Sequence, residues 1–183
     1  MSSDWRIAFL EDLIAPGSSI TYGVVKPGER DENGVLFIRG GDIADGEIQT
    51  SELRTISPAI SQQYKRTLLK GGELLVSLVG NPGQVAIVPP SLAGANIARQ
   101  VGLVRLGEQV EPNFVKYYLL SQKGQEALGA KSKGSVQQVI NLKDLKTLKV
   151  PVPDLPEQKA IAKILSSLDA VSYTHLRAHE TVL

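Results

Sequence analysis

The sequence of 183 residues contains no cysteine, only two histidines and one tryptophan. The absence of cysteine excludes disulfides and thiolate metal sites, and it fits a reducing compartment, so we expect a cytoplasmic protein. No apolar run approaches the roughly 18 residues that a membrane-spanning helix needs. The first residues show no basic stretch leading into an apolar one, so we expect neither a signal peptide nor a membrane partner.

The chain as a whole also lacks an excess of charge of either sign, since its net charge is +1. The charged residues are, however, unevenly distributed along the sequence. Residues 1–50 carry four basic and nine acidic side chains, whereas residues 115–150 carry seven lysines and two carboxylates. A local excess of lysine attracts polyanions, although it is equally typical of a solvated lysine-rich face. Charge alone therefore leaves both interpretations open.

Catalytic signatures are scarce as well. The segment from Asn81 to Gln84 is similar to the Asn-Pro-Pro-aromatic motif of adenine methyltransferases, but Gln84 replaces the aromatic residue that would stack on a flipped base. The glycine-rich turn that would bind a nucleotide cofactor is also missing. His175 and His179 could supply only two ligands to a metal, and a metal site needs three or more. We expect no catalysis, no cofactor and no metal.

Short apolar runs that end at glycine or proline turns predict a mostly β core. Four such runs are expected to be strands: Val35 to Ile38, Glu73 to Val79, Gln84 to Val88 and Gln100 to Leu106. Ser57 followed by Pro58 has the pattern of a helix start, so a short helix is expected through Tyr64.

The second half of the chain changes to helical spacing. Apolar residues from Asn113 predict a helix that Gly124 breaks in two, and residues 131–135 form a polar loop. Residues 136–141 are expected to return to the sheet or its edge. Three prolines at positions 151, 153 and 156 then mark a boundary.

An amphipathic helix is predicted after Pro156, with an apolar stripe at helical spacing. The stripe comprises Ile161, Ile164, Leu165 and Leu168. The segment after Val171 interrupts the stripe and resembles translated sequencing-adapter DNA, so we expect it not to continue the helix. The predicted organisation is a domain over residues 1–153, a helix start over 154–171 and a non-native tail over 172–183.

Four segments together resemble one half of the specificity subunit of a type I restriction–modification system. The segments are Trp5 with Leu10 to Leu13, Val35 to Ile43, Leu69 to Pro89, and Gln138 to Ile164. The last is the most specific, because a strand leads through Val-Pro-x-Pro into Leu-Pro and a long helix. The resemblance covers residues 4–170, and it depends on the order and spacing of the segments rather than on any single motif.

The resemblance implies an α+β fold, in which a β-rich target recognition domain with small helices precedes a C-terminal coiled-coil-type helix. It implies a non-catalytic subunit that recognises double-stranded DNA and directs methyltransferase and endonuclease subunits to a bipartite target. Its partners would be methyltransferase subunits and, through them, restriction subunits. With so short a stripe, we expect only a weak homodimer or pairing with a second recognition unit. Two alternatives remain open: a stand-alone nucleic-acid-modifying enzyme, and a protein–protein adaptor that acts through the helix.

Candidate DNA contacts are loop residues whose guanidinium, amide, hydroxyl or ammonium groups suit base edges or phosphates. They are Tyr22, Arg39, Asn81, Arg99, Lys131, Lys133, Ser135, Gln137 and Gln138. Each of them could equally be a solvated loop residue. The candidate partner contacts are the four residues of the apolar stripe.

Overall fold

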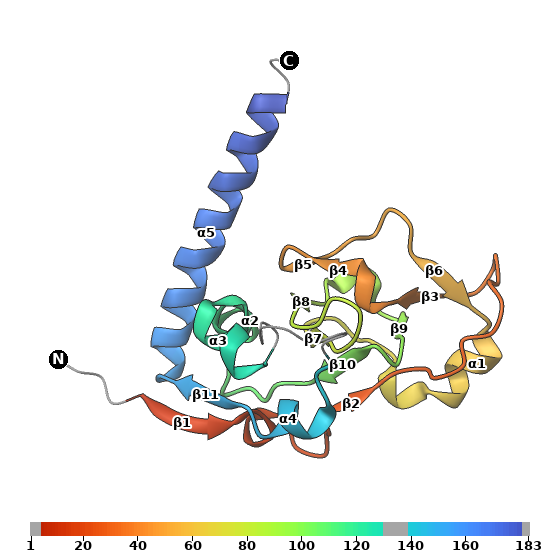
Figure 1. Ribbon diagram of the computed structural model, residues 1–183, viewed down its shortest axis with the longest axis horizontal. Helices are drawn as coiled ribbons and strands as arrows, with labels where there is room; N and C mark the ends of the chain where they lie inside the picture. The colour runs from red at the N-terminus through yellow and green to blue at the C-terminus, as the bar shows by residue number, and fades with distance from the viewer. Residues whose placement is uncertain (1–4, 130–138, 181–183) are drawn as a thin grey trace.

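The computed structural model describes residues 5–129 and 139–180, with side chains of the last helix described through Ser172. Strands and small helices form a body, from which one long helix projects (Figure 1). The predicted α+β class is therefore confirmed. Among the described residues, no helix combines the length and the apolar character that crossing a membrane requires.

The central sheet is antiparallel and has four strands in the order β2-β10-β7-β8. These strands are Thr21–Tyr22, Val101–Val104, Leu74–Ser77 and Val85–Ile87. Every residue of β7 and β10 is buried. Successive side chains of a strand point to opposite faces of the sheet, so burial of both faces explains why these segments are unbroken apolar runs.

The two faces of the central sheet belong to two different parts of the core. Leu74 and Val76 pack with the helical side of the body, whereas Leu75 packs with the second sheet. That second sheet has the order β6-β3-β9 and comprises Arg54–Ile56, Val35–Ile38 and Asn96–Ile97. A hairpin of β4 (Ile43–Ala44) with β5 (Glu47–Ile48) lies beside β8 of the central sheet, and β1 (Arg6–Phe9) pairs with β11 (Lys149–Val152).

Two close approaches of the backbone depend on glycine. At Gly23, an added Cβ would lie 1.9 Å from the Ile97 carbonyl oxygen, where the chain passes from β2 to contact β9. At Gly124, it would lie 2.1 Å from the Tyr118 carbonyl oxygen. Gly23 thus marks a crossing between the two sheets.

Most of the predicted helices form where expected. Helix α1 spans Pro58–Gln63, and the Ser57 side chain accepts a hydrogen bond from the Ile60 amide, as the predicted helix start requires. Helices α2 (Pro112–Leu120) and α3 (Gln122–Ala127) meet at Ser121, whose hydroxyl oxygen caps α3. The prediction that Gly124 makes this break is wrong, because Gly124 lies inside α3, where its missing side chain permits close packing on α2.

The C-terminal helix begins as predicted but ends later. Helix α4 (Leu142–Lys146) and β11 lead to α5, which spans Leu155–Glu180, 26 residues or about 39 Å at 1.5 Å per residue. The prediction that the segment after Val171 does not continue the helix is therefore wrong for the backbone. The helix was predicted to end where the apolar stripe is interrupted. A helix that is mostly exposed, however, needs no apolar stripe to keep its backbone helical. The proposed non-native origin of 172–183 stays a prediction.

Candidate functional site

Arg39 stands where β3 ends, and the carboxylate of Asp42 fixes its side chain. The Arg39 amide and Nε donate to Asp42 Oδ2 at 2.7 and 3.1 Å, and Nη2 donates to Oδ1 at 2.9 Å. The hydrogen bond and the charge of Asp42 raise the pKa of Arg39 above its ordinary value. The Asp42 side chain is 11% exposed while that of Arg39 is 45% exposed, so a buried acid orients an accessible guanidinium.

Three other arginines gather around Arg39 in what we call the arginine cleft. It comprises two pockets of about 140 and 520 Å³ that share Arg39 and Arg54. The smaller pocket adds Arg99 and Gln100, and the larger adds Arg30 together with Glu52. Arg54 Nη2 donates to the Gly28 carbonyl oxygen. The structure thus brings Arg39 and Arg99 together, although they lie 60 residues apart in the chain.

Sequence reasoning missed Arg30, Arg54 and Gln100. Arg54 reaches the cleft because β6 pairs with β3 and places Arg54 opposite Phe37. That pairing brings together parts of the chain that no local pattern connects. Gln100, which directly follows the candidate Arg99, could have been found from this adjacency.

The turn that carries Asn81 approaches the arginine cleft at Gly40. A Cβ at Gly40 would lie 3.0 Å from the Val79 carbonyl oxygen and 3.3 Å from Gln100 Cβ, so three segments meet at this glycine. The Leu78 amide donates to the Gln100 carbonyl oxygen at 2.7 Å and thereby joins two of them directly. Asn81 is exposed in the turn that follows, although it is not among the residues that line the cleft.

The described chain after residue 138 returns to the same place. Val139 forms an antiparallel bridge with Val79, and the Ile140 amide donates to the Leu78 carbonyl oxygen at 2.9 Å. The predicted return to the sheet edge is therefore confirmed for residues 139 and 140. Five candidate contacts lie outside the described residues: Lys131, Lys133, Ser135, Gln137 and Gln138.

Tyr22 lies on the edge strand of the central sheet. It pairs with Gly102 of β10, and 39% of its surface is exposed. Asn96, which precedes Arg99, is by contrast fully buried: its amide donates to Ser61 Oγ at 3.1 Å and its carbonyl oxygen accepts from Thr67 Oγ1 at 2.7 Å. Asn96 is thus a structural residue of the core, and Tyr22 is accessible to a ligand.

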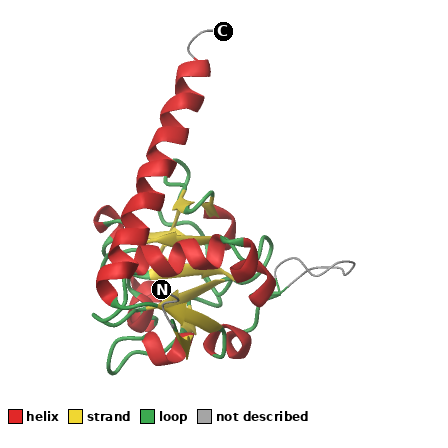
Figure 2. Ribbon diagram, turned by 90° about the vertical axis from the view of Figure 1, so that its left-hand side faces the viewer, coloured by secondary structure: helices red, strands yellow, loops and turns green. Residues whose placement is uncertain are grey.

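The apolar stripe of α5 divides between the body and the surface. Ile161 is partly buried against the core, and Leu165 is also partly buried. Ile164 and Leu168 are 62% and 58% exposed. Figure 2 shows most of the length of α5 beyond the strands, which agrees with this division.

Within the described residues, no three side chains of histidine, aspartate or glutamate gather in a way that could hold a metal ion. The side chains of His175 and His179 are not among those described. The site defined here is accordingly one of charge and hydrogen-bond donors, built from arginines on a β-rich frame.

The fold and the cleft define a class of protein: an α+β domain with arginines gathered beside its strands and one long helix projecting from its body. The chain belongs to the family of the type I restriction modification DNA specificity domain, whose family model matches residues 3–180. The resemblance seen in the sequence is thereby confirmed.

Known relatives agree with this membership. The chain is 36% identical over 168 residues to the type I restriction enzyme EcoBI specificity subunit of Escherichia coli, covering 91% of this chain and 35% of the relative. It is 26% identical over 171 residues to the MjaVIII specificity subunit of Methanocaldococcus jannaschii, covering 91% of this chain and 40% of the relative. The chain thus spans well under half the length of these curated relatives.

A solved structure shares the fold. The HsdS subunit from Thermoanaerobacter tengcongensis superposes with a TM-score of 0.69 at 20% identity, covering 98% of this chain and 46% of that one. At this level of identity the likeness concerns the fold alone.

Proposed function

We propose that this chain is one target recognition unit of a type I specificity subunit and that it binds double-stranded DNA in a sequence-dependent way. The single observation that carries the proposal is the convergence of Arg39, Arg54 and Arg99 on one cleft in a chain of this family. In such a role the chain is a non-catalytic subunit. It directs methyltransferase subunits, and through them restriction subunits, to one half of a bipartite target.

The geometry of Arg39 supports contact with a base rather than with phosphate alone. Arginine recognises guanine in the major groove through two parallel hydrogen bonds to O6 and N7, which requires a fixed orientation of the guanidinium. The hydrogen bonds from Arg39 to Asp42 supply that orientation before DNA arrives, so binding costs less side-chain entropy. Arg99, which is exposed on the same cleft, is the second candidate for such a contact.

Phosphate contacts are proposed for Lys131 and Lys133, with Ser135, Gln137 and Gln138 beside them. The lysine excess of residues 115–150 motivates this assignment. Changing both lysines to alanine should weaken binding equally on all sequences. The dependence of log affinity on log salt should become shallower by about 0.9 for each phosphate that the protein no longer neutralises. An unchanged salt dependence would remove this segment from the interface.

Partner contacts are proposed for the stripe of α5. Exposed apolar residues at helical spacing are suited to packing against another helix. Ile164 and Leu168 are the exposed members of the stripe. Ile161 and Leu165 are partly buried, and their exposed surface would add to the contact with a partner. The proposed partners are the helix of a second recognition unit and the methyltransferase subunits.

Selection from a library of random duplexes with the purified chain would test DNA recognition. We expect enrichment of one half-site. On that half-site, Arg39→Ala should cost about 1–3 kcal/mol and relax one base position. Arg6→Ala is the matched control, because Arg6 is an exposed arginine on β1 and is not among the residues that line the cleft.

Two outcomes would count against the proposal. If the wild-type chain enriched no sequence, DNA recognition by this unit would be excluded. If Arg39→Ala weakened cognate and random DNA equally, Arg39 would be reassigned to backbone contact.

A further inference from the structure

A second basic cavity lies at the other end of strand β10 from the arginine cleft. Its volume is about 480 Å³, and four of the ten described residues that line it are basic, whereas none is a carboxylate. We call it the lysine pocket, after Lys65 and Lys70, which are both exposed. Arg66 and Arg105 complete the basic set.

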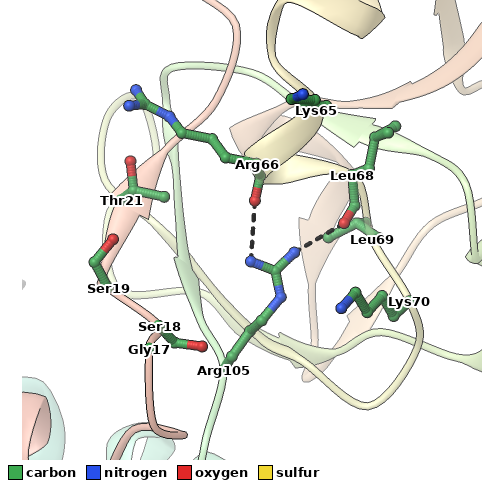
Figure 3. Close-up of a pocket in the computed structure, with 10 residues that line it drawn as sticks. All are labelled: Gly17, Ser18, Ser19, Thr21, Lys65, Arg66, Leu68, Leu69, Lys70 and Arg105. Atoms are coloured by element: carbon green, nitrogen blue, oxygen red, sulfur yellow. Dashed lines mark hydrogen bonds between the residues drawn. The ribbon is translucent and has the colours of Figure 1, made fainter.

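Arg105 forms the fixed part of the pocket (Figure 3). Its Nη1 donates to the Arg66 carbonyl oxygen at 3.0 Å, and its Nη2 donates to the Leu68 carbonyl oxygen at 2.8 Å. Its Nε lies 3.7 Å from Glu73 Oε1, and Glu73 is buried and accepts from the amides of Lys70 and Gly71. The charge of Arg105 is therefore balanced inside the protein, which leaves the three other basic side chains to attract an anion.

Hydroxyl groups stand across the pocket from the lysines. Ser18, Ser19 and Thr21 line it, and Figure 3 draws Ser19 and Thr21 on one side of Arg105 and Lys70 on the other. Hydroxyl groups and ammonium groups are among the side chains that hydrogen-bond to phosphate oxygens of a nucleic acid. The pocket thus combines charge with neutral donors for one anion of phosphate type.

The position of the lysine pocket relative to the arginine cleft suits one continuous ligand. Gln100 lines the cleft and Arg105 lines the pocket. The five residue steps between them along β10 span roughly 17 Å. Tyr22 lies between them, because it pairs with Gly102 on the exposed edge of the sheet. A distance of roughly 17 Å equals about five base pairs of a duplex, which rises about 3.4 Å along its axis for each base pair.

We propose that the lysine pocket binds a backbone phosphate of the same duplex whose bases reach the arginine cleft. This inference rests on the DNA binding proposed above. The pocket would fix the position of the duplex on the domain and contribute affinity that is independent of sequence. A free phosphate ion offers the same chemistry, and the experiment separates the two sources.

The test replaces Lys65 and Lys70 together by glutamine and measures the dependence of log affinity on log salt with a random-sequence duplex. We expect a slope shallower by about 0.9, which is the change for the one phosphate that the pocket neutralises. The matched control is Lys159→Gln with Lys163→Gln, which removes equal charge from exposed positions of α5. The control should keep the wild-type slope, and thermal unfolding should verify that both variants fold.

Two further measurements complete the design. With the selected half-site, the pocket variant should keep its base preference while binding all sequences more weakly, unlike Arg39→Ala. Inorganic phosphate alone is then titrated into the wild-type chain and followed by NMR. If the pocket binds a phosphate only as part of DNA, free phosphate should bind weakly and should not saturate the site at millimolar concentration.

Each outcome is decisive. Equal slopes for the pocket variant and its control, with Arg39→Ala still weakening binding, would overturn the pocket while leaving the proposed function intact. Saturable binding of inorganic phosphate together with equal slopes would make it a site for a free anion. Absence of DNA binding by the wild-type chain would overturn the proposed function and, with it, the assignment of the pocket to DNA.

Discussion

The base of α5 and its outer part belong to the same helix but are covered differently. At the base, Gln158 and Ala162 are 1% and 5% exposed. Further out, Ile164 and Leu168 are 62% and 58% exposed. Ile164 follows Ala162 by only two residues, which turn a helix by about 200°, so the face of α5 that meets the body separates them as much as the distance along the helix does.

Helix α2 sets this boundary. It lies against α5, and the Tyr117 hydroxyl contacts Ser166 Oγ at 3.2 Å and Asp169 Oδ2 at 2.8 Å. The base of α5 is therefore part of the folding unit. The outer apolar residues bury little surface on folding and so contribute little to the free energy of unfolding. The comparison teaches that one helix can belong to the core at its base and stay exposed further out.

The largest effect is expected from a charge placed at the base of the helix. Ala162→Lys puts a long, charged side chain into a packed position of the core and should lower the free energy of unfolding by about 3 kcal/mol. For a domain of this size, the melting temperature should fall by roughly 6–12 °C. Thermal unfolding followed by circular dichroism measures this.

Ile164→Lys is the matched control, with the same new residue only two positions away. Its free energy of unfolding should stay within about 0.5 kcal/mol of the wild type, as for other exposed positions. Equal destabilisation by the two variants would show that the body covers both parts of α5.

A smaller loss is expected when Gln158 becomes leucine. Gln158 Oε1 accepts from the Glu111 amide and Nε2 donates to the Pro153 carbonyl oxygen, both at 2.9 Å. Leucine preserves the volume but leaves these backbone groups without their partner, which should cost about 2 kcal/mol in urea unfolding. Lys159→Leu, at the exposed neighbouring position, should change stability little, and a loss equal to that of Gln158→Leu would contradict the role of the amide.

The glutamine also shows what the sequence could and could not predict. Local patterns identified four strands of the two main sheets (β3, β7, β8 and β10), the capped start of α1 and the start of α5, because apolar runs, caps and prolines act over a few residues. They could not predict that Gln158 joins α5 to the residue preceding α2, or that Arg54 of β6 enters a cleft with Arg39. Both depend on pairing between distant segments.

The same limit applies to the ends and breaks of helices. Gly124 was expected to break a helix, yet its close contact with the Tyr118 carbonyl oxygen makes it a packing residue. Arg39 and Arg99 were predicted as separate loop residues, and their shared cleft follows from the parallel pairing of β3 with β9. The residue types of the site were thus predictable from the sequence, but their arrangement in space was not.

Replacing Ile164 and Leu168 together by lysine should affect assembly far more than stability. Because both positions are exposed, the body should unfold within about 0.5 kcal/mol of the wild type. Any self-association of the chain should disappear in sedimentation, as should capture of a methyltransferase subunit in a pull-down. Retained assembly would place the partner surface elsewhere, and an unfolded variant would show that the body covers these residues after all.

The smallest effect concerns Tyr117, whose hydroxyl joins α2 to the outer part of α5. Burial, followed by its hydrogen bond to Asp169, raises the pKa of Tyr117, while the hydrogen bond with Ser166 acts in the opposite direction. Since the folded-state pKa lies above the unfolded value of 10.0, the neutral hydroxyl contributes stability that is present below that pH and lost as the pH rises through the folded-state pKa. Tyr117→Phe should cost about 0.5 kcal/mol near pH 8 and less near pH 11.

Urea unfolding at both pH values measures the two differences between the wild type and Tyr117→Phe. A cost that stays constant from pH 8 to about pH 11 would mean that the pKa of Tyr117 is the same in the folded and the unfolded state. The contact would then add only apolar area, and the boundary between the covered and the uncovered part of α5 would rest on packing alone.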